Sequence, residues 1–115
     1  MSRLTLMVGL ALIGCGDGEP QDSGKNDACS QHAVAVTWEG GGEAFFRTRC
    51  CSCHSSTAPY RYGAPEYLNY DTFEGVQEAV HAIQQAALWD QVMPPGLPLS
   101  AEEQELLESF LDCGL

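Results

Sequence analysis

The stretch FFRTRCCSCHSS, residues 45 to 56, places three cysteines and a histidine within five consecutive positions. Cys50 and Cys53 stand three apart, and His54 follows directly after the second of them. Cys51 lies between the two. Thiols this close together serve disulfides, metal sites or covalent cofactors. The compartment of the protein, the other cysteines and the flanking elements therefore decide what this stretch does.

The N-terminus indicates export. Arg3 precedes an apolar run, residues 4 to 13, that is too short to span a bilayer as a permanent helix. The run ends in LIGC, residues 12 to 15, which resembles the lipobox of bacterial lipoproteins. That resemblance implies a signal peptide over residues 1 to 14 and a diacylated Cys15 as the first mature residue. The alternative is an ordinary cleaved signal with Cys15 near the cut.

The segment after Cys15 is polar. Residues 16 to 28, GDGEPQDSGKNDA, contain no large apolar side chain, so they cannot form a core. We predict a lipid-anchored flexible tether over residues 15 to 34 and one domain over residues 35 to 115. A domain this small has marginal stability unless a covalent or metal link adds to its core.

The chain is strongly acidic. The full sequence has a formal net charge of −11, and removal of residues 1 to 14, which carry one arginine and no acid, makes it −12. A negative surface argues against nucleic acid and against docking on anionic lipid. It would attract partners with basic surfaces.

The rest of the sequence predicts an all-α fold of three main helices with long loops. The last helix is the clearest, because Ser100 and Glu103 form a capping box and Gly114 marks its end. Asp71 and Glu74 indicate the start of a middle helix. Its apolar positions repeat at spacings of three and four: Phe73, Val76, Val80, Ile83 and Ala87.

The first helix is predicted to be short and to end at the cysteine stretch. It carries Phe45 and Phe46, and the glycines at residues 40 to 42 weaken its start. Val34, Val36 and Trp38 alternate as in a β-strand. No second strand is available to pair with them, so the all-α prediction stands.

The stretch contains Cys-x-x-Cys-His, the attachment signature of c-type haem. In that chemistry two thiols add to the two vinyl groups at one porphyrin edge, and the imidazole of the next residue binds the iron. One helical turn would bring Cys50, Cys53 and His54 together for this purpose. A chance match is the alternative. A zinc knuckle needs a second ligand pair and a thioredoxin-like site needs a βαβ setting, and the sequence offers neither.

A second feature agrees with haem binding. In QVMPPGLPLS, residues 91 to 100, Met93 precedes two prolines that hold the chain extended. A thioether presented from such a loop is able to bind haem iron. The alternative is a turn in which Met93 is a buried side chain without a ligand role.

The order of helix, CxxCH, further helices, methionine loop and final helix resembles class I cytochrome c over about residues 37 to 113. In that family a glycine and an aromatic residue, here Gly42 and Phe46, pack against the last helix. The last helix of the family matches this chain at three positions: Leu107, Phe110 and Leu111.

The resemblance also implies a site. It assigns one covalent haem c to Cys50 and Cys53, with His54 as the first axial ligand of the iron. Met93 is implied as the second axial ligand, and His81 is the alternative because the interval between His54 and Met93 is short. The carbonyl of Pro65, or that of its rival Pro59, is expected to accept the imidazole N–H.

Three cysteines remain for an oxidising compartment once Cys15 is lipidated and two thiols hold haem. Cys29 and Cys113 lie at the two ends of the folded part, and we favour a disulfide between them. The competing bridge joins Cys51 to Cys113, because the first and last helices are expected to touch.

These features predict an electron carrier rather than an enzyme. Two filled axial positions leave the iron no open site for a substrate, and Met ligation favours ferrous iron. We expect the protein to be anchored by lipid in the bacterial cell envelope, facing the periplasm or the outer surface, and to exchange single electrons with redox proteins. The alternatives are a five-coordinate haem enzyme or gas sensor, and a disulfide-stapled binding lipoprotein without haem.

Overall fold

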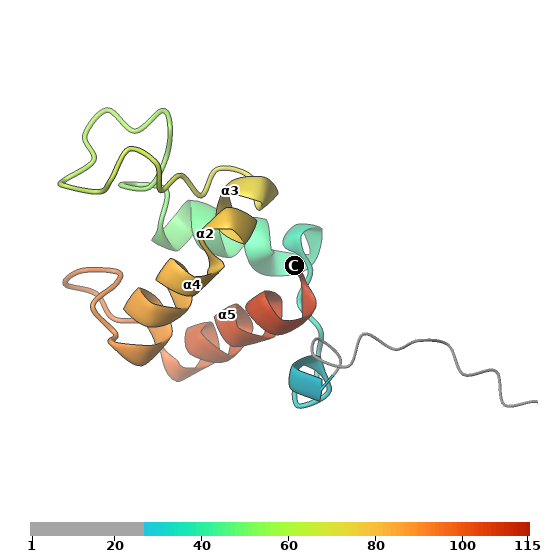
Figure 1. Ribbon diagram of the computed structural model, residues 1–115. Coiled ribbons are helices and arrows are strands. Elements are labelled where there is room, and N and C mark those ends of the chain that lie inside the picture. The colour runs from blue at the N-terminus through green and yellow to red at the C-terminus, as the bar shows by residue number, and fades with distance from the viewer. Residues whose placement is uncertain (1–26) are drawn as a thin grey trace, which may run out of the picture.

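A computed structural model describes residues 27 to 115, and all the regular elements in that part are helices (Figure 1). The all-α prediction is therefore confirmed for the described residues. The predicted signal peptide, Cys15 and the first part of the tether lie outside them. The elements are η1 (Trp38–Gly42), α2 (Glu43–Arg49), α3 (Phe73–Glu78), α4 (Val80–Ile83), η2 (Gln84–Trp89) and α5 (Ala101–Cys113), where η marks a π-helical segment.

The first helical segment consists of η1 followed directly by α2. The Thr37 hydroxyl caps it by accepting a hydrogen bond from the Gly40 N–H at 2.9 Å. Gly41 has a φ of 145°, which only glycine adopts readily, so the axis kinks at this residue, within η1. The segment ends at Cys50, whose N–H donates to the Phe46 carbonyl. The predicted first helix is thus present and ends where the cysteine stretch begins.

The middle helix is interrupted. The Thr72 hydroxyl, and not Asp71, caps α3, because it accepts from the Gly75 N–H at 3.1 Å. The Asp71 carboxylate accepts instead from the Ser56 N–H at 2.7 Å. At Ala79 the backbone leaves helical geometry, and α4 and η2 continue from there. One amphipathic stripe therefore spans three short elements.

The last helix agrees with its prediction. The Ser100 hydroxyl accepts from the Glu103 N–H at 3.1 Å, and the Glu103 carboxylate accepts from the Ser100 N–H at 2.9 Å. These two bonds make the capping box. The helix ends at Cys113, and the Gly114 N–H closes its last turn on the Phe110 carbonyl at 2.7 Å.

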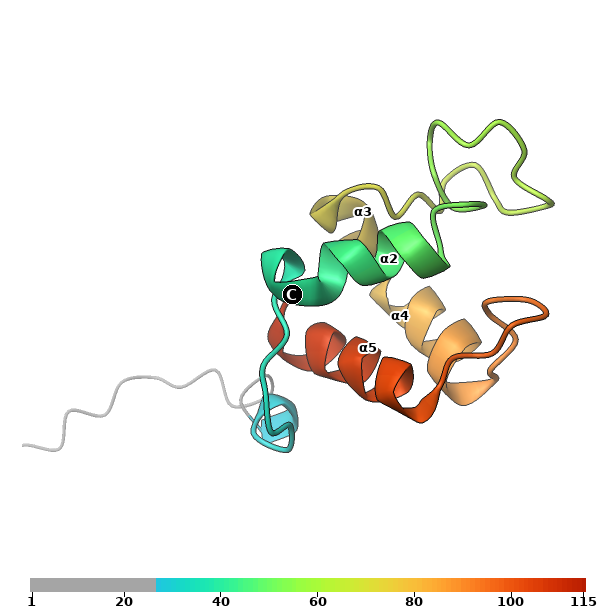
Figure 2. The same cartoon turned by 180° about the vertical axis from the view of Figure 1, so that it is seen from behind.

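Aromatic side chains dominate the core between the first and last helices. The rings of Phe46 and Phe110 are fully buried, and their centroids lie 5.8 Å apart. Trp38 stacks on Phe46 and makes a tilted contact with Phe110. Leu107 and Val76 fill the remaining fully buried positions. Figures 1 and 2 show α2 and α5 on opposite sides of this core, with the loops over residues 51 to 72 and 90 to 100 extending from the same end of the molecule.

The residues before η1 are attached to α5. Cys29 forms a disulfide with Cys113, with their Cα atoms 4.9 Å apart, as predicted. The Ser109 hydroxyl donates to the Val34 carbonyl at 2.6 Å. No helix within residues 27 to 115 is long and apolar enough to cross a membrane.

Candidate functional site

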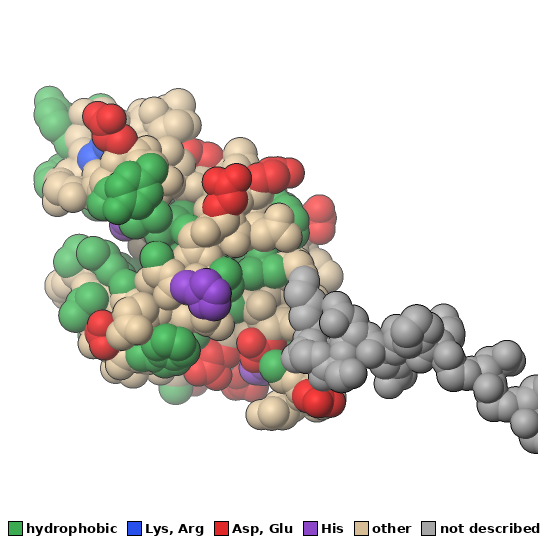
Figure 3. Space-filling model, viewed as in Figure 1, with side chains coloured by type: hydrophobic (Ala, Val, Ile, Leu, Met, Phe, Trp, Pro, Cys, Tyr) green, Lys and Arg blue, Asp and Glu red, His purple; other side chains and the backbone are tan. Residues whose placement is uncertain are grey.

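A cavity of about 550 Å³ opens between the two loops at the end of the molecule. Figure 3 shows this hollow at the left, between two lobes, with apolar side chains on each side of it. Its volume lies within the usual range of small-molecule and cofactor sites. The apolar walls come from α2, α4, η2, α5 and both loops, and include Phe45, Phe46, Leu68, Ile83, Ala86, Leu99 and Leu107.

The cysteine stretch forms one wall of this cavity. The His54 N–H donates to the Cys50 carbonyl at 2.9 Å, and the Cys53 N–H donates to the same carbonyl at 3.2 Å. This single turn brings Cys50, Cys53 and His54 to the cavity, as the spacing predicts. Cys51 does not line the cavity but packs against the hydrophobic core. The structure therefore separates the two motif cysteines from the third one.

The three thiols of this stretch are free, and burial disfavours the thiolate form of Cys50 and Cys51. Burial raises the pKa of Cys50 to about 12, and the neighbouring Cys51 acts in the same direction. Burial also raises the pKa of Cys51, and the Asp71 carboxylate adds to that effect. Both groups are protonated at neutral pH, whereas catalytic cysteines react as thiolates. The burial of Cys50 and Cys51 thus weighs against either of them as the nucleophile of a thiol enzyme.

His54 is held as a neutral imidazole with one free nitrogen. Its Nδ1 lies 3.2 Å from the Leu68 carbonyl oxygen, and a carbonyl only accepts, so the proton belongs on Nδ1. Burial lowers the pKa of His54, which favours the neutral ring. The ring stacks on Tyr70 with centroids 4.7 Å apart. Nε2 keeps its lone pair, as metal ligation requires.

The predicted acceptor for this imidazole was wrong. The Pro65 carbonyl does not contact His54 but accepts from Nη2 of Arg61 at 2.6 Å, and Leu68 takes the predicted role. The reason is that the loop folds around Arg61, which turns the Pro65 carbonyl away from the histidine. Pro65 itself remains part of the cavity wall, whereas Pro59 does not line it.

Met93 reaches the same cavity from the other loop. Its N–H donates to the Ala86 carbonyl at 3.1 Å, which fixes the start of that loop against η2. The side chain lines the cavity and is 38 % exposed. His81, the alternative ligand, is exposed on α4 and is not part of the cavity wall. The structure therefore brings Met93, and not His81, into one cavity with His54.

Arg49 connects the methionine loop to the helices. Its Nη2 donates to the Leu97 carbonyl at 2.9 Å, and its Nε lies 2.9 Å from a carboxylate oxygen of Glu103. The second contact is an ion pair without hydrogen-bond geometry, since Nε has no hydrogen-bond partner. The end of α2, the loop after Pro95 and the start of α5 are joined at this point.

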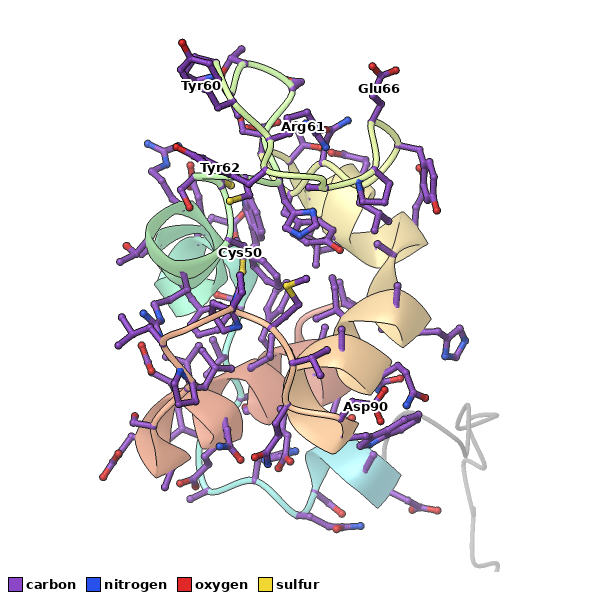
Figure 4. All side chains as sticks on the ribbon, turned by 90° about the vertical axis from the view of Figure 1, so that its left-hand side faces the viewer. Cys50, Tyr60, Arg61, Tyr62, Glu66 and Asp90 are labelled. Carbon is purple, nitrogen blue, oxygen red and sulfur yellow. A yellow bond between two sulfur atoms is a disulfide. The ribbon has the colours of Figure 1, made fainter. Side chains whose placement is uncertain are left out.

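Arg61 is a second cavity residue that sequence reasoning missed (Figure 4). Its guanidinium donates to four carbonyls of the loop over residues 55 to 69, including that of Leu68, and to the Asn69 side chain. One signal was available, because Arg61 is the only Lys or Arg between residues 50 and 115. A lone cation in an acidic chain is often structural, but its partners are not visible in a sequence.

Comparisons of the chain with protein-family models, with characterised proteins and with solved structures found no match. Within residues 27 to 115 no cluster of three or more His, Cys, Asp or Glu side chains is arranged to hold a metal ion.

Proposed function

We propose that this protein is a mono-haem c-type cytochrome that carries single electrons between redox partners. One observation supports the proposal above the others. Cys50, Cys53, His54 and Met93 line one apolar cavity, although Met93 lies 39 residues after His54 in the sequence. Cys51 and His81, the residues that compete for the same roles, lie outside the cavity wall.

The residues of the cavity fit a covalently attached haem. Two free thiols at the spacing of the attachment signature are suited to thioether bonds, and a neutral imidazole with a free Nε2 is suited to iron. The apolar wall would exclude water from a flat aromatic ring. When bound, haem would supply an iron that changes between the ferric and ferrous states by one electron.

The remaining residues favour transfer over catalysis. His54 and the Met93 thioether would both bind the iron. A soft thioether favours ferrous iron and raises the reduction potential. If both side chains bind the iron, no place remains on it for a substrate, so the function proposed is that of a carrier.

The location and the partners belong to the same proposal. We place the chain in the bacterial cell envelope, anchored through a lipidated Cys15. The acidic side chains spread over the face in Figure 3 would attract redox proteins with basic surfaces. Such attraction increases the rate of encounter more than the affinity.

Substitution of Met93 tests this proposal. In protein produced with a c-haem maturation system, the oxidised wild type should show the weak long-wavelength absorption of an iron–thioether bond. Met93→Ala should abolish that absorption while haem stays covalently attached. The reduced variant should bind carbon monoxide, because an axial position is then open.

His81→Ala is the matched control, since this exposed histidine lies outside the cavity wall. It should change neither the absorption nor the reaction with carbon monoxide. If the reduced wild type already binds carbon monoxide, the carrier assignment fails and a five-coordinate enzyme or sensor takes its place. If His81→Ala opens the iron, the protein is a bis-histidine cytochrome of lower potential.

A further inference from the structure

Arg61 uses every donor that it has. A guanidinium carries five N–H groups, and the structure gives Arg61 five hydrogen bonds. The acceptors are the carbonyls of Ser55, Ala64, Pro65 and Leu68 and the side-chain oxygen of Asn69, at 2.5, 3.3, 2.6, 3.0 and 2.7 Å respectively. Figure 4 shows the Arg61 side chain inside the loop that these residues form.

Because all five N–H groups are bonded, Arg61 cannot bind an anionic ligand, which is the usual role of an arginine in a cavity. No N–H group of Arg61 is left for a carboxylate or phosphate of a bound ligand. In residues 27 to 115 the ion pairs within 4.0 Å involve other side chains, so no carboxylate competes for this guanidinium. Arg61 therefore acts on the loop backbone and not on an anion.

One of the five bonds leads directly to the proposed iron ligand. The Leu68 carbonyl accepts from Nη2 of Arg61 at 3.0 Å and from Nδ1 of His54 at 3.2 Å. A carbonyl oxygen has two lone pairs, so it can accept both donors at once. Arg61 also bonds to the Pro65 carbonyl and to the Asn69 side chain, on either side of Leu68, and these bonds limit how far the Leu68 carbonyl can turn.

We propose that Arg61 is a positioning residue, which holds the Leu68 carbonyl in the place where it fixes the tautomer and orientation of His54. The proposal rests on the proposed function, because it takes His54 as the iron ligand. Partners of a ligating histidine keep its ring oriented and its second nitrogen free for the metal. The loop over residues 55 to 69 is thus part of the site, although none of its residues is a proposed iron ligand.

The imidazole proton of His54 supplies the test. In nitrogen-15-labelled reduced protein, the NMR shifts of the ring nitrogens give the tautomer, and solvent exchange of the Nδ1 proton gives the strength of its protection. Wild-type protein should be protonated on Nδ1. Arg61→Gln should accelerate exchange at least about tenfold, which corresponds to roughly 1.4 kcal/mol of lost protection.

Arg49→Gln is the matched control. It removes a second arginine from the same cavity wall, but Arg49 bonds to the Leu97 carbonyl and not to Leu68. It should leave the exchange rate of the His54 proton unchanged. Equal acceleration by both variants would show a general loosening of the cavity and would overturn the positioning role.

Arg61→Lys keeps the test usable if the glutamine variant does not fold. Lysine retains the charge and has three donors, so exchange should be faster than in wild type but slower than in Arg61→Gln. An unchanged rate in Arg61→Lys and Arg61→Gln would contradict the proposal. If the protein carries no haem, the proposed cytochrome function fails. The positioning role of Arg61 can still be tested in that case, because exchange of the His54 proton reports whether Arg61 holds the imidazole in place.

Discussion

At the residue scale, the contact between the first and last helices depends on the absence of a side chain at Gly42. A Cβ atom at this position would lie 2.9 Å from two ring carbons of Phe110 and 3.2 Å from the Thr37 carbonyl oxygen. Gly42 is buried and has helical dihedral angles, so its backbone does not require glycine. Glycine is required at this position because the Phe110 ring approaches so closely.

Gly42→Ala should therefore destabilise the protein by about 1–3 kcal/mol, the usual cost of overpacking. Helix propensity alone would have the opposite effect, since alanine is favoured over glycine in a helix. Denaturant titration measures the free energy of unfolding of four proteins. These are the wild type, Gly42→Ala, Phe110→Leu and the double variant that combines the two changes. The cost of Gly42→Ala should be smaller in the Phe110→Leu background. An alanine variant as stable as wild type would show that the ring moves freely.

The residues of the site differ in how far the sequence predicts them. Gly42 and Phe46 pack against α5 as the resemblance implies, because short-range spacing on a helix sets which side chains meet. The acceptor for His54 was predicted wrongly. Its direction depends on how a loop folds around Arg61, and no periodic pattern records that arrangement.

At the element scale, the middle helix is also only partly predictable from the sequence. Its apolar spacing predicts a helix, and Val76, Ala79 and Ile83 are buried accordingly. The break at Ala79 was not predictable, because the hydrophobic stripe continues across it. The start was assigned to Asp71, one residue too early. Asp71 binds the Ser56 N–H across the loop, and only the tertiary structure shows this.

The disulfide connects the two ends of the folded part and should contribute substantially to its stability. Cys29 and Cys113 are 84 positions apart in sequence, and closing a loop of this length stabilises by about 4 kcal/mol on the chain-entropy estimate. The double variant Cys29→Ser/Cys113→Ser should lose about that much free energy of unfolding, measured by denaturant titration.

Cys51→Ala is the control for the disulfide, because Cys51 is free and partly buried. It should cost clearly less than the double variant. A double variant with wild-type stability would show that the bridge does not form in the protein. Because the double variant also removes Cys113, a loss from Cys51→Ala as large as that from the double variant would favour the competing bridge from Cys51 to Cys113.

At the scale of the whole molecule, the proposed carrier is a small acidic domain with a cavity at one end and its first described residues attached to α5. A lipid on Cys15 would keep the domain close to a membrane, while the acidic surface discourages contact with anionic lipid. The lipid anchor and the acidic surface are inferred from the lipobox resemblance and from the composition. Cys15 lies outside the described residues.

Cys15→Ser tests the anchor. The variant should appear in the soluble fraction or keep its signal peptide, because diacylation requires the thiol. Cell fractionation followed by mass determination of the purified protein distinguishes these outcomes. Cys51→Ser, which removes a thiol unrelated to the anchor, should stay with the membranes. Tight membrane association of a form that lacks residues 1 to 15 would contradict a lipid anchor.

The central claim is that Cys50 and Cys53 hold haem covalently while Cys51 does not. Trypsin cleaves after Arg49 and Arg61, so a single peptide, residues 50 to 61, carries all three thiols. The protein should be made with a c-haem maturation system, alkylated under denaturing conditions and digested, and this peptide analysed by mass spectrometry. The account predicts the mass of the peptide plus one haem and one alkyl group, with the alkyl group on Cys51. A peptide with three alkyl groups and no haem, or with Cys50 or Cys53 alkylated, would contradict it.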